Sequence, residues 1–227
     1  MAGADARLRS VLDRIAHAAE RAGRDPASVT LIGATKGVEA ARVCDAVAAG
    51  LHDLGENQIQ EALPKIAAVG PGPRWHFIGH LQRNKARLAA GPFVLIHTID
   101  SPRVAEAVDR AAGIADLRVA VLVQVNMAGQ TTRSGVAPSG VEELVAAVRA
   151  CDHLAPVGLM TMAPMAADPE EVRPIFRRVR ELRDRLRIGI AGEQFWELSM
   201  GMSDDYEVAI EEGATLVRIG RAIFGVR

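Results

Sequence analysis

The chain has 227 residues, of which 49% are hydrophobic and 24% are charged, and its formal net charge at pH 7 is −1. This near-neutral balance excludes a general electrostatic attraction to nucleic acid or to anionic membranes. The longest apolar runs, such as Val119 to Val123, are too short to span a bilayer. The first ten residues lack a signal-peptide core, and Cys44 and Cys151 are isolated, so we expect a cytoplasmic protein without a disulfide framework.

Short apolar or β-rich segments alternate with helical patterns along the chain. An opening helix from Asp5 to Ala22 falls within a lead-in of residues 1–28. Strands are expected near residues 29–35, 51–55, 75–79, 94–99, 117–125, 156–162, 194–199 and 215–219. Helices are expected between them at residues 38–49, 57–68, 82–90, 102–113, 139–151, 169–187 and 204–212.

Strand–helix alternation repeated eight times predicts an α/β fold, a parallel (β/α)8 TIM barrel with an extra N-terminal helix. No Pro/Ser-rich linker or low-complexity tract divides the chain, so we expect a single domain over residues 1–227. The alternative is a doubly wound sheet. It is disfavoured because no G-x-G-x-x-G follows the first strand and no Walker motif is present.

Lys36 follows the first predicted strand directly and precedes a glycine. We expect an amine at the mouth of a buried strand to be held rigidly and partly removed from water, which favours its neutral, nucleophilic form. The alternative is a strand-end lysine that simply reaches solvent. The nucleophile is favoured because the segment 216–220, at the far end of the chain, is another strand that finishes in a glycine.

The loops after the seventh and eighth strands carry small and polar residues, at the two positions where phosphate sites recur in such barrels. The seventh strand runs into the segment 198–203, which contains Ser199 and Ser203, and the eighth ends in Gly220-Arg221. Small residues let backbone amides approach an anion, a hydroxyl donates a hydrogen bond, and a helix N-terminus adds partial positive charge. These glycines could instead serve tight turns only, but their presence in both loops favours a phosphate site.

Arg218 lies between Val217 and Ile219 in the eighth strand, so the alternation of faces directs its side chain to the ligand end of the barrel. A buried arginine needs an acceptor, for which a ligand ring nitrogen or the carboxylate of Glu197 would serve. Its charge would also help to keep Lys36 neutral. A reactive lysine, an anion site and an arginine for a ring acceptor match the aldehyde, phosphate and pyridine nitrogen of pyridoxal phosphate.

Six ordered motifs, spread from about residue 29 to the C-terminus, resemble those of the pyridoxal phosphate homeostasis proteins, single-domain relatives of the alanine racemase barrel. They are Ala-Thr-Lys at 34–36, Gly-Glu-Asn at 55–57, Trp-His-Phe-Ile-Gly-His-Leu-Gln at 75–82, Gly-Leu-Met-Thr-Met at 158–162, Leu-Ser-Met-Gly-Met-Ser at 198–203 and Val-Arg-Ile-Gly at 217–220. The resemblance implies the barrel of fold-type III pyridoxal phosphate proteins. It also implies a role in vitamin B6 homeostasis, in which the cofactor is buffered and delivered without established turnover.

The resemblance also assigns roles to residues of this chain. Lys36 carries the Schiff base, Asn57 lies beside the cofactor, and Arg218 contacts the pyridine nitrogen. The phosphate is held by Ser203, by Gly220 and, through its backbone, by Arg221. The predicted site is completed by His80, Met162 and Ser199. We expect a monomer that contacts apo-enzymes only transiently.

Two other functions remain open on the same barrel, and a third possibility is an interaction protein that binds no small molecule. A racemase would need a second base, but the single tyrosine, Tyr206, lies at the strand-seven loop, and we expect no second domain after Arg227. An arginine at the ring nitrogen would also weaken the electron sink. A Schiff-base aldolase would need an acid or tyrosine near Lys36, and none is evident. His76 and His80 are four residues apart but span a strand end and its loop, so we expect no metal.

Overall fold

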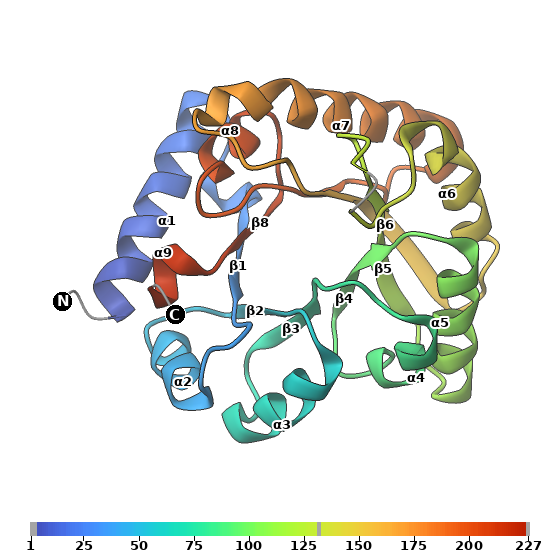
Figure 1. The fold of residues 1–227 in the computed structure, drawn as a ribbon, viewed down its shortest axis with the longest axis horizontal. Coiled ribbons are helices and arrows are strands. Elements are labelled where there is room, and N and C mark those ends of the chain that lie inside the picture. Colours follow the sequence, from blue (N-terminus) through green and yellow to red (C-terminus); the bar gives the residue numbers. More distant parts are fainter. Residues whose placement is uncertain (1–3, 131–132, 226–227) are drawn as a thin grey trace.

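The structure is a computed structural model that describes residues 4–130 and 133–225. Within these residues, eight parallel strands close into a barrel in chain order, surrounded by helices (Figure 1). The predicted TIM-barrel fold is therefore confirmed. The strands are β1 (Thr30–Ala34), β2 (Asp53–Glu56), β3 (Arg74–Phe77), β4 (Leu95–Ile99), β5 (Val119–Val125), β6 (Leu154–Thr161), β7 (Glu197–Ser199) and β8 (Leu216–Ile219).

The helices follow the predicted order, with one addition and one shortening. They are α1 (Ala4–Arg21), α2 (Ala40–Ala48), α3 (Ile59–Val69), α4 (Ala86–Ala89), α5 (Pro102–Ile114), α6 (Val141–Arg149), α7 (Arg173–Leu186), α8 (Tyr206–Glu211) and α9 (Arg221–Phe224). The helix expected over residues 82–90 is instead a 3-10 turn (Arg83–Lys85) followed by the short α4. Helix α9 was not predicted.

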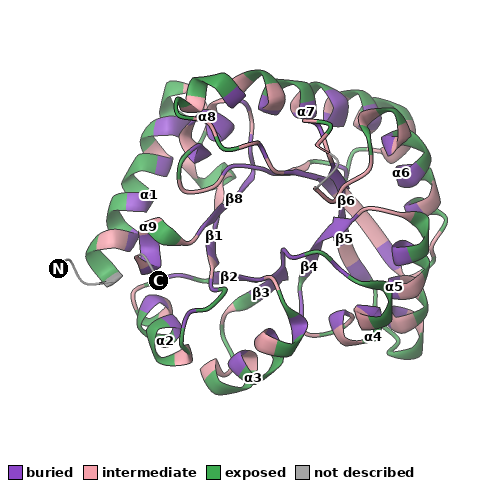
Figure 2. Ribbon diagram, viewed as in Figure 1, coloured by how far each residue is buried: buried purple, intermediate pink, exposed green. Residues whose placement is uncertain are grey.

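The helices pack on the barrel because each has one apolar face. Helix α7 is the clearest case: it buries Phe176, Val179 and Leu182, which recur at three-residue spacing. Its arginines lie mainly on the other faces, where Arg177 pairs with Glu212 at 2.9 Å. Figure 2 shows the same division for the ring of helices, with buried residues toward the barrel and exposed residues outward.

The barrel interior is unusual because only part of it is apolar. An inner cluster of Ile32, Leu95, Leu122, Met160 and Leu216 is separate from the larger core under the helices. Barrel interiors are normally filled by branched apolar side chains. Here several charged or polar side chains of the strands are also buried, namely Asp53, His76, His97, Ser199 and Arg218.

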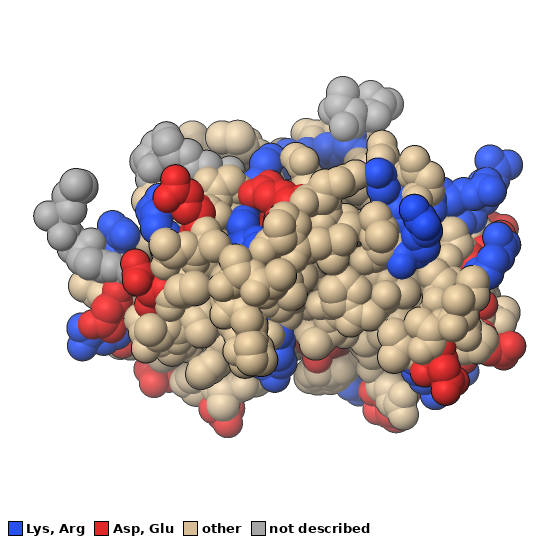
Figure 3. All heavy atoms as spheres, turned by 90° about the horizontal axis from the view of Figure 1, so that it is seen from below, with Lys and Arg blue, Asp and Glu red and all other residues tan. Residues whose placement is uncertain are grey.

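The outer surface carries charges of both signs. On the face shown in Figure 3, lysine and arginine side chains are interspersed with aspartate and glutamate. In the described part of the chain, no helix is both long and apolar enough to cross a membrane. Both cysteines, Cys44 and Cys151, are free thiols.

Candidate functional site

The predicted site residues gather at one end of the barrel. All eight strands of the described chain run in the same direction, so their carboxyl ends open on one face. Four strand ends, those of β1, β2, β7 and β8, supply most of the predicted residues, and the loops after β3 and β6 supply the others. By strand, these residues are Lys36 (β1), Asn57 (β2), His80 (β3), Met162 (β6), Ser199 and Ser203 (β7), and Arg218, Gly220 and Arg221 (β8).

Lys36 lies in the turn after β1, and its side chain is exposed. The expectation that its surroundings partly remove it from water is therefore wrong. The turn itself is held on both sides of the lysine. The Thr35 N–H donates to the Gly55 carbonyl at 2.9 Å, and the Gly37 N–H donates to Glu61 Oε1 at 2.6 Å. The amine thus projects into solvent from a fixed backbone.

A buried ion pair supports this turn from the helix side of the barrel. Lys65 of α3 is only 7% exposed and forms an ion pair with Glu56, which is fully buried. The Lys65 ammonium also donates to the Thr35 carbonyl at 2.8 Å, and the Thr35 hydroxyl donates to Glu56 Oε1 at 2.6 Å. A second carboxylate, Glu61, lies 3.1 Å from the same ammonium. This cluster was not predicted from the sequence, although Lys65 lies on the buried face of α3.

Asn57 and His80 are brought together by a glycine contact. A Cβ atom at Gly79 would lie 1.9 Å from the Asn57 carbonyl oxygen, so only glycine lets the two loops touch here. Asn57 and His80 line one cavity of about 260 Å³. The exposed His80 ring has its Nδ1 3.4 Å from Asp100 Oδ2. Asn57, which follows β2, and His80, which follows β3, therefore line the same cavity.

The loop after β8 lies against the end of β1. A Cβ atom at Gly220 would be 3.2 Å from the Ala34 carbonyl oxygen, two residues before Lys36. The Arg221 side chain extends into solvent and pairs with Asp204. Helix α9 has four residues, and the first N–H groups of a helix lack partners within it. This short helix therefore offers only a few such N–H groups and no long helix dipole.

The loop after β7 is closed by its own carboxylate. Asp205 Oδ1 accepts a hydrogen bond from the Met202 N–H at 2.6 Å, and the Gly201 carbonyl accepts from the Arg218 N–H at 3.0 Å. Burial raises the pKa of Asp205. Ser203 in this loop is half-buried. The loop is therefore tied to β8, next to the Gly220 loop.

Arg218 is 5% exposed and faces the barrel interior, as strand alternation predicts. Its guanidinium donates to Ser199 Oγ and to the Thr161 carbonyl at 2.9 Å. The suggested partner Glu197 is wrong, because its carboxylate accepts from Thr215 Oγ1 instead. Burial lowers the pKa of Arg218 to about 10, and Asp205 opposes the shift. Half-buried Met162 packs beside this region, against the inner apolar cluster.

The two histidines of the 75–82 motif lie in different parts of the barrel. His80 is at the rim, whereas His76 points inward, with its Nε2 2.9 Å from Asp53 Oδ1 and its Nδ1 3.1 Å from His97 Nε2. His97 Nδ1 lies 2.8 Å from Ser199 Oγ. Burial, and then the neighbouring His76 and Arg218, hold the pKa of His97 well below its usual range. Among the described residues, no group of three His, Cys, Asp or Glu side chains could hold a metal ion.

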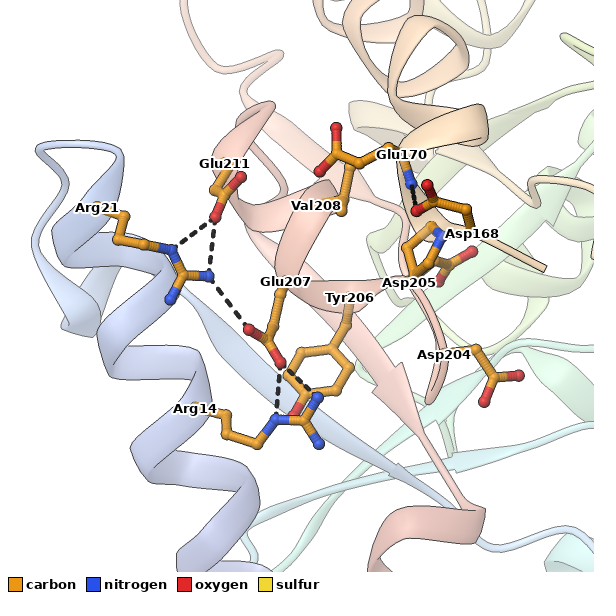
Figure 4. Close-up of a pocket in the computed structure, with 11 residues that line it drawn as sticks. Arg14, Arg21, Asp168, Glu170, Asp204, Asp205, Tyr206, Glu207, Val208 and Glu211 are labelled. Atoms are coloured by element: carbon orange, nitrogen blue, oxygen red, sulfur yellow. Dashed lines mark hydrogen bonds and ion pairs between the residues drawn. The ribbon is translucent and has the colours of Figure 1, made fainter. Parts of the chain in front are cut away.

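Tyr206 lies away from the predicted site. A cleft of about 240 Å³ lies outside the barrel between α1 and α8, where Arg14 and Arg21 face Glu207 and Glu211 (Figure 4). The Tyr206 ring is buried there beneath Arg14, whose guanidinium carbon is 5.2 Å from the ring centroid. Its side chain thus packs against α1, outside the barrel, and not at the mouth where Lys36 projects.

Comparison with known proteins places the chain in a class. Residues 7–227 match the family model described as the alanine racemase N-terminal domain. The chain is 43% identical over 224 residues to the pyridoxal phosphate homeostasis protein of Aquifex aeolicus, covering 97% of each. It is 44% identical over 223 residues to the protein of the same description from Pseudomonas aeruginosa, covering 97% of this chain and 94% of that one.

A solved structure agrees with these relatives. The structure of PipY of Synechococcus elongatus, described as having PLP bound, superposes with a TM-score of 0.81 at 34% identity, covering 95% of this chain and 100% of that one. The fold and site thus define a barrel of the alanine racemase N-terminal type. Within that class, the chain belongs to the pyridoxal phosphate homeostasis protein family.

Proposed function

We propose that this protein binds pyridoxal 5'-phosphate covalently through Lys36 and holds it as part of intracellular vitamin B6 homeostasis. The observation that carries the proposal is the close approach of the Gly220 loop to the end of β1. A Cβ atom at Gly220 would lie 3.2 Å from the Ala34 carbonyl oxygen. This contact places the loop proposed to bind the phosphate beside the turn that carries Lys36. The names of the relatives and the cofactor-bound PipY structure give independent support.

The residues fit the three reactive parts of the cofactor. The exposed Lys36 amine can condense with the aldehyde carbon, releasing its oxygen as water. The Ser203 hydroxyl and the backbone N–H groups of Gly220 and Arg221 would hold the phosphate. Arg218 supplies only hydrogen-bond donors, as an unprotonated ring nitrogen requires. The remaining residues that would line the site are Asn57, His80, Met162 and Ser199.

Arg218 also favours holding the cofactor over turnover. Bound pyridoxal phosphate supplies an electron sink for chemistry at the α-carbon of amino acids. A guanidinium that donates to the ring nitrogen leaves that nitrogen unprotonated, which weakens the sink. Tyr206, buried against α1, offers no base at the opposite face. We therefore propose a carrier role, with residues 1–227 acting as one cofactor-binding domain.

We extend this proposal to the setting in which the carrier works. The protein would be a cytoplasmic monomer, because both cysteines are free thiols and the surface in Figure 3 shows mixed charges. It would meet apo-enzymes only transiently, as release of the cofactor requires. Gel filtration with light scattering, with and without pyridoxal phosphate, tests the monomer directly. A stable dimer would contradict this part of the proposal.

Titration with pyridoxal phosphate, followed by absorbance, tests the function. The wild-type protein should become yellow as its imine forms, and Lys36→Ala should retain weak binding through the phosphate loops without the imine band. Lys85→Ala is the matched control, since Lys85 lines the Asn57–His80 cavity but lies outside the β1 turn. An unchanged imine band in Lys36→Ala would contradict the proposal.

A further inference from the structure

A chain of polar side chains crosses the barrel interior and ends on Arg218. It begins where Arg74 Nε donates to Asp53 Oδ1 at 2.8 Å. From Asp53 it passes to His76 at 2.9 Å, to His97 at 3.1 Å and to Ser199 at 2.8 Å. The Arg218 guanidinium then donates to the same Ser199 oxygen. The chain therefore connects the amino-terminal mouth of the barrel with the end that carries the site.

The donors and acceptors of this chain fix its proton positions. Arginine has donors only, so Ser199 Oγ accepts from Arg218. The single hydroxyl proton of Ser199 is satisfied in the described structure only if it is donated to His97 Nδ1. The His97 proton then lies on Nε2 and is donated to His76 Nδ1.

The other end of this hydrogen-bonded chain is consistent with the same direction. An ionised Asp53 can only accept, so His76 carries its proton on Nε2, facing the carboxylate. Hydrogen bonds from His76 and Arg74 hold the pKa of Asp53 below its ordinary value, although burial alone would raise it. Both rings are thus neutral Nε2–H tautomers, and every hydrogen bond between Arg218 and Asp53 points away from Arg218, whereas Arg74 donates to Asp53 from the opposite end.

This direction matters because Arg218 is a buried cation. It is 5% exposed, and within the described residues neither of its hydrogen-bond acceptors is a carboxylate. A buried charge without a direct counter-ion is costly unless oriented dipoles stabilise it. The aligned chain places the negative end of the Ser199 hydroxyl on the guanidinium. A proton on His97 Nδ1 would turn that hydroxyl away, and it would also add a like charge if Nε2 kept its proton.

We propose that His97 is a positioning residue, which acts through Ser199 to hold the Arg218 guanidinium toward the ring nitrogen of the bound cofactor. The identity of the ring rests on the proposed function. The direction of the hydrogen bonds between Arg218 and Asp53 is inferred from the protein's own contacts. The charged or titratable groups around His97 are His76 on β3, Arg218 on β8, and Asp53 and Arg74 beyond His76. Asp205 lies near Arg218 and balances part of its charge.

Histidine tautomers can be read directly by two-dimensional nitrogen-15 NMR on protein labelled at histidine. Spectra of the cofactor-free protein at neutral pH should show His76 and His97 as neutral rings with the proton on Nε2. His52, whose side chain is exposed, provides a reference ring in the same spectrum. A proton on Nδ1 of either interior ring would overturn the proposal. This readout does not depend on whether the cofactor binds.

A comparison of two ligands then tests the link to the ring. His97→Phe keeps the ring volume and removes the acceptor, so pyridoxal phosphate should bind about tenfold more weakly, as for one lost charged hydrogen bond. An analogue with carbon in place of the ring nitrogen should bind wild type and variant equally. Equal weakening for both ligands would mean that His97 has only a structural role and would overturn the proposal.

A conservative variant keeps the test decisive if His97→Phe folds poorly. In His97→Asn, the side-chain oxygen can still accept from Ser199, so the preference for the ring-nitrogen ligand should be largely restored. Ser199→Ala, which breaks the contact with Arg218 directly, should lose that preference. Should wild type bind neither ligand, the proposed function would fail while the tautomer measurement still decides the direction of the chain.

Discussion

Replacement of Arg218 by methionine separates stability from ligand binding. Burial lowers the pKa of Arg218 to about 10, a shift that corresponds to about 3 kcal/mol of unfavourable desolvation. The side chain regains a similar amount from hydrogen bonds to Ser199 and the Thr161 carbonyl, at about 1.5–3 kcal/mol for each bond of a charged group. The two effects nearly cancel in the cofactor-free protein.

We therefore expect Arg218→Met to change the free energy of unfolding by no more than about 2 kcal/mol, less than the 3–5 kcal/mol for a broken buried ion pair. Pyridoxal phosphate should bind more weakly by about 1.5–3 kcal/mol. Urea unfolding without ligand measures the first quantity, and an absorbance titration measures the second. Arg24→Met is a matched control, because Arg24 donates to the Ile210 carbonyl at 2.7 Å outside the barrel. A loss of stability above about 4 kcal/mol with unchanged affinity would refute the reasoning.

The remaining predictions concern the buried ion pair of Lys65, the carboxylate of Asp53 and amino-acid turnover. Lys65→Met leaves Glu56 buried without its cation, so the free energy of unfolding, measured in urea, should fall by about 3–5 kcal/mol. Adding Glu56→Gln should recover part of this loss. A change below about 1 kcal/mol would contradict a stabilising ion pair. The pKa of Asp53 is lowered, so its stabilisation is present above the ordinary carboxyl pKa of about 4 and is lost as the pH falls further. Asp53→Asn should then show a smaller drop in melting temperature between pH 6 and pH 3 than wild type, and an equal drop would exclude this contribution. Incubation with L-alanine in heavy water should give slow α-deuterium exchange at most; D-alanine formed at about 1 s⁻¹ or faster would restore the racemase alternative.

The order of strands and helices could be predicted because it depends on local patterns. Alternation of apolar segments with helical periodicity specified a (β/α)8 barrel, and the alternation within 217–219 correctly turned Arg218 inward. The length of helix α4 was overestimated because Arg83–Lys85 forms a 3-10 turn. Residues after strand ends could also be predicted as neighbours, since parallel strands bring their carboxyl ends to one face.

The interior chain and the support of Lys36 could not be predicted in the same way. Asp53, His76 and His97 lie on three different strands, and their contacts depend on the register between strands that only the closed barrel fixes. The inward direction of His76 was nevertheless readable, because it lies between the apolar residues Trp75 and Phe77. The exposure of Lys36 was mispredicted because the solvent around a turn depends on what fills the barrel mouth.

Chemical trapping tests the central claim most directly. Wild-type protein incubated with pyridoxal phosphate and then reduced with borohydride should carry one phosphopyridoxyl group on the peptide that contains Lys36. Peptide mass spectrometry locates the modified lysine, and Lys36→Ala should lose it. An adduct found instead on Lys65 or Lys85, or unchanged labelling of Lys36→Ala, would contradict the assignment of Lys36 as the residue that holds the cofactor.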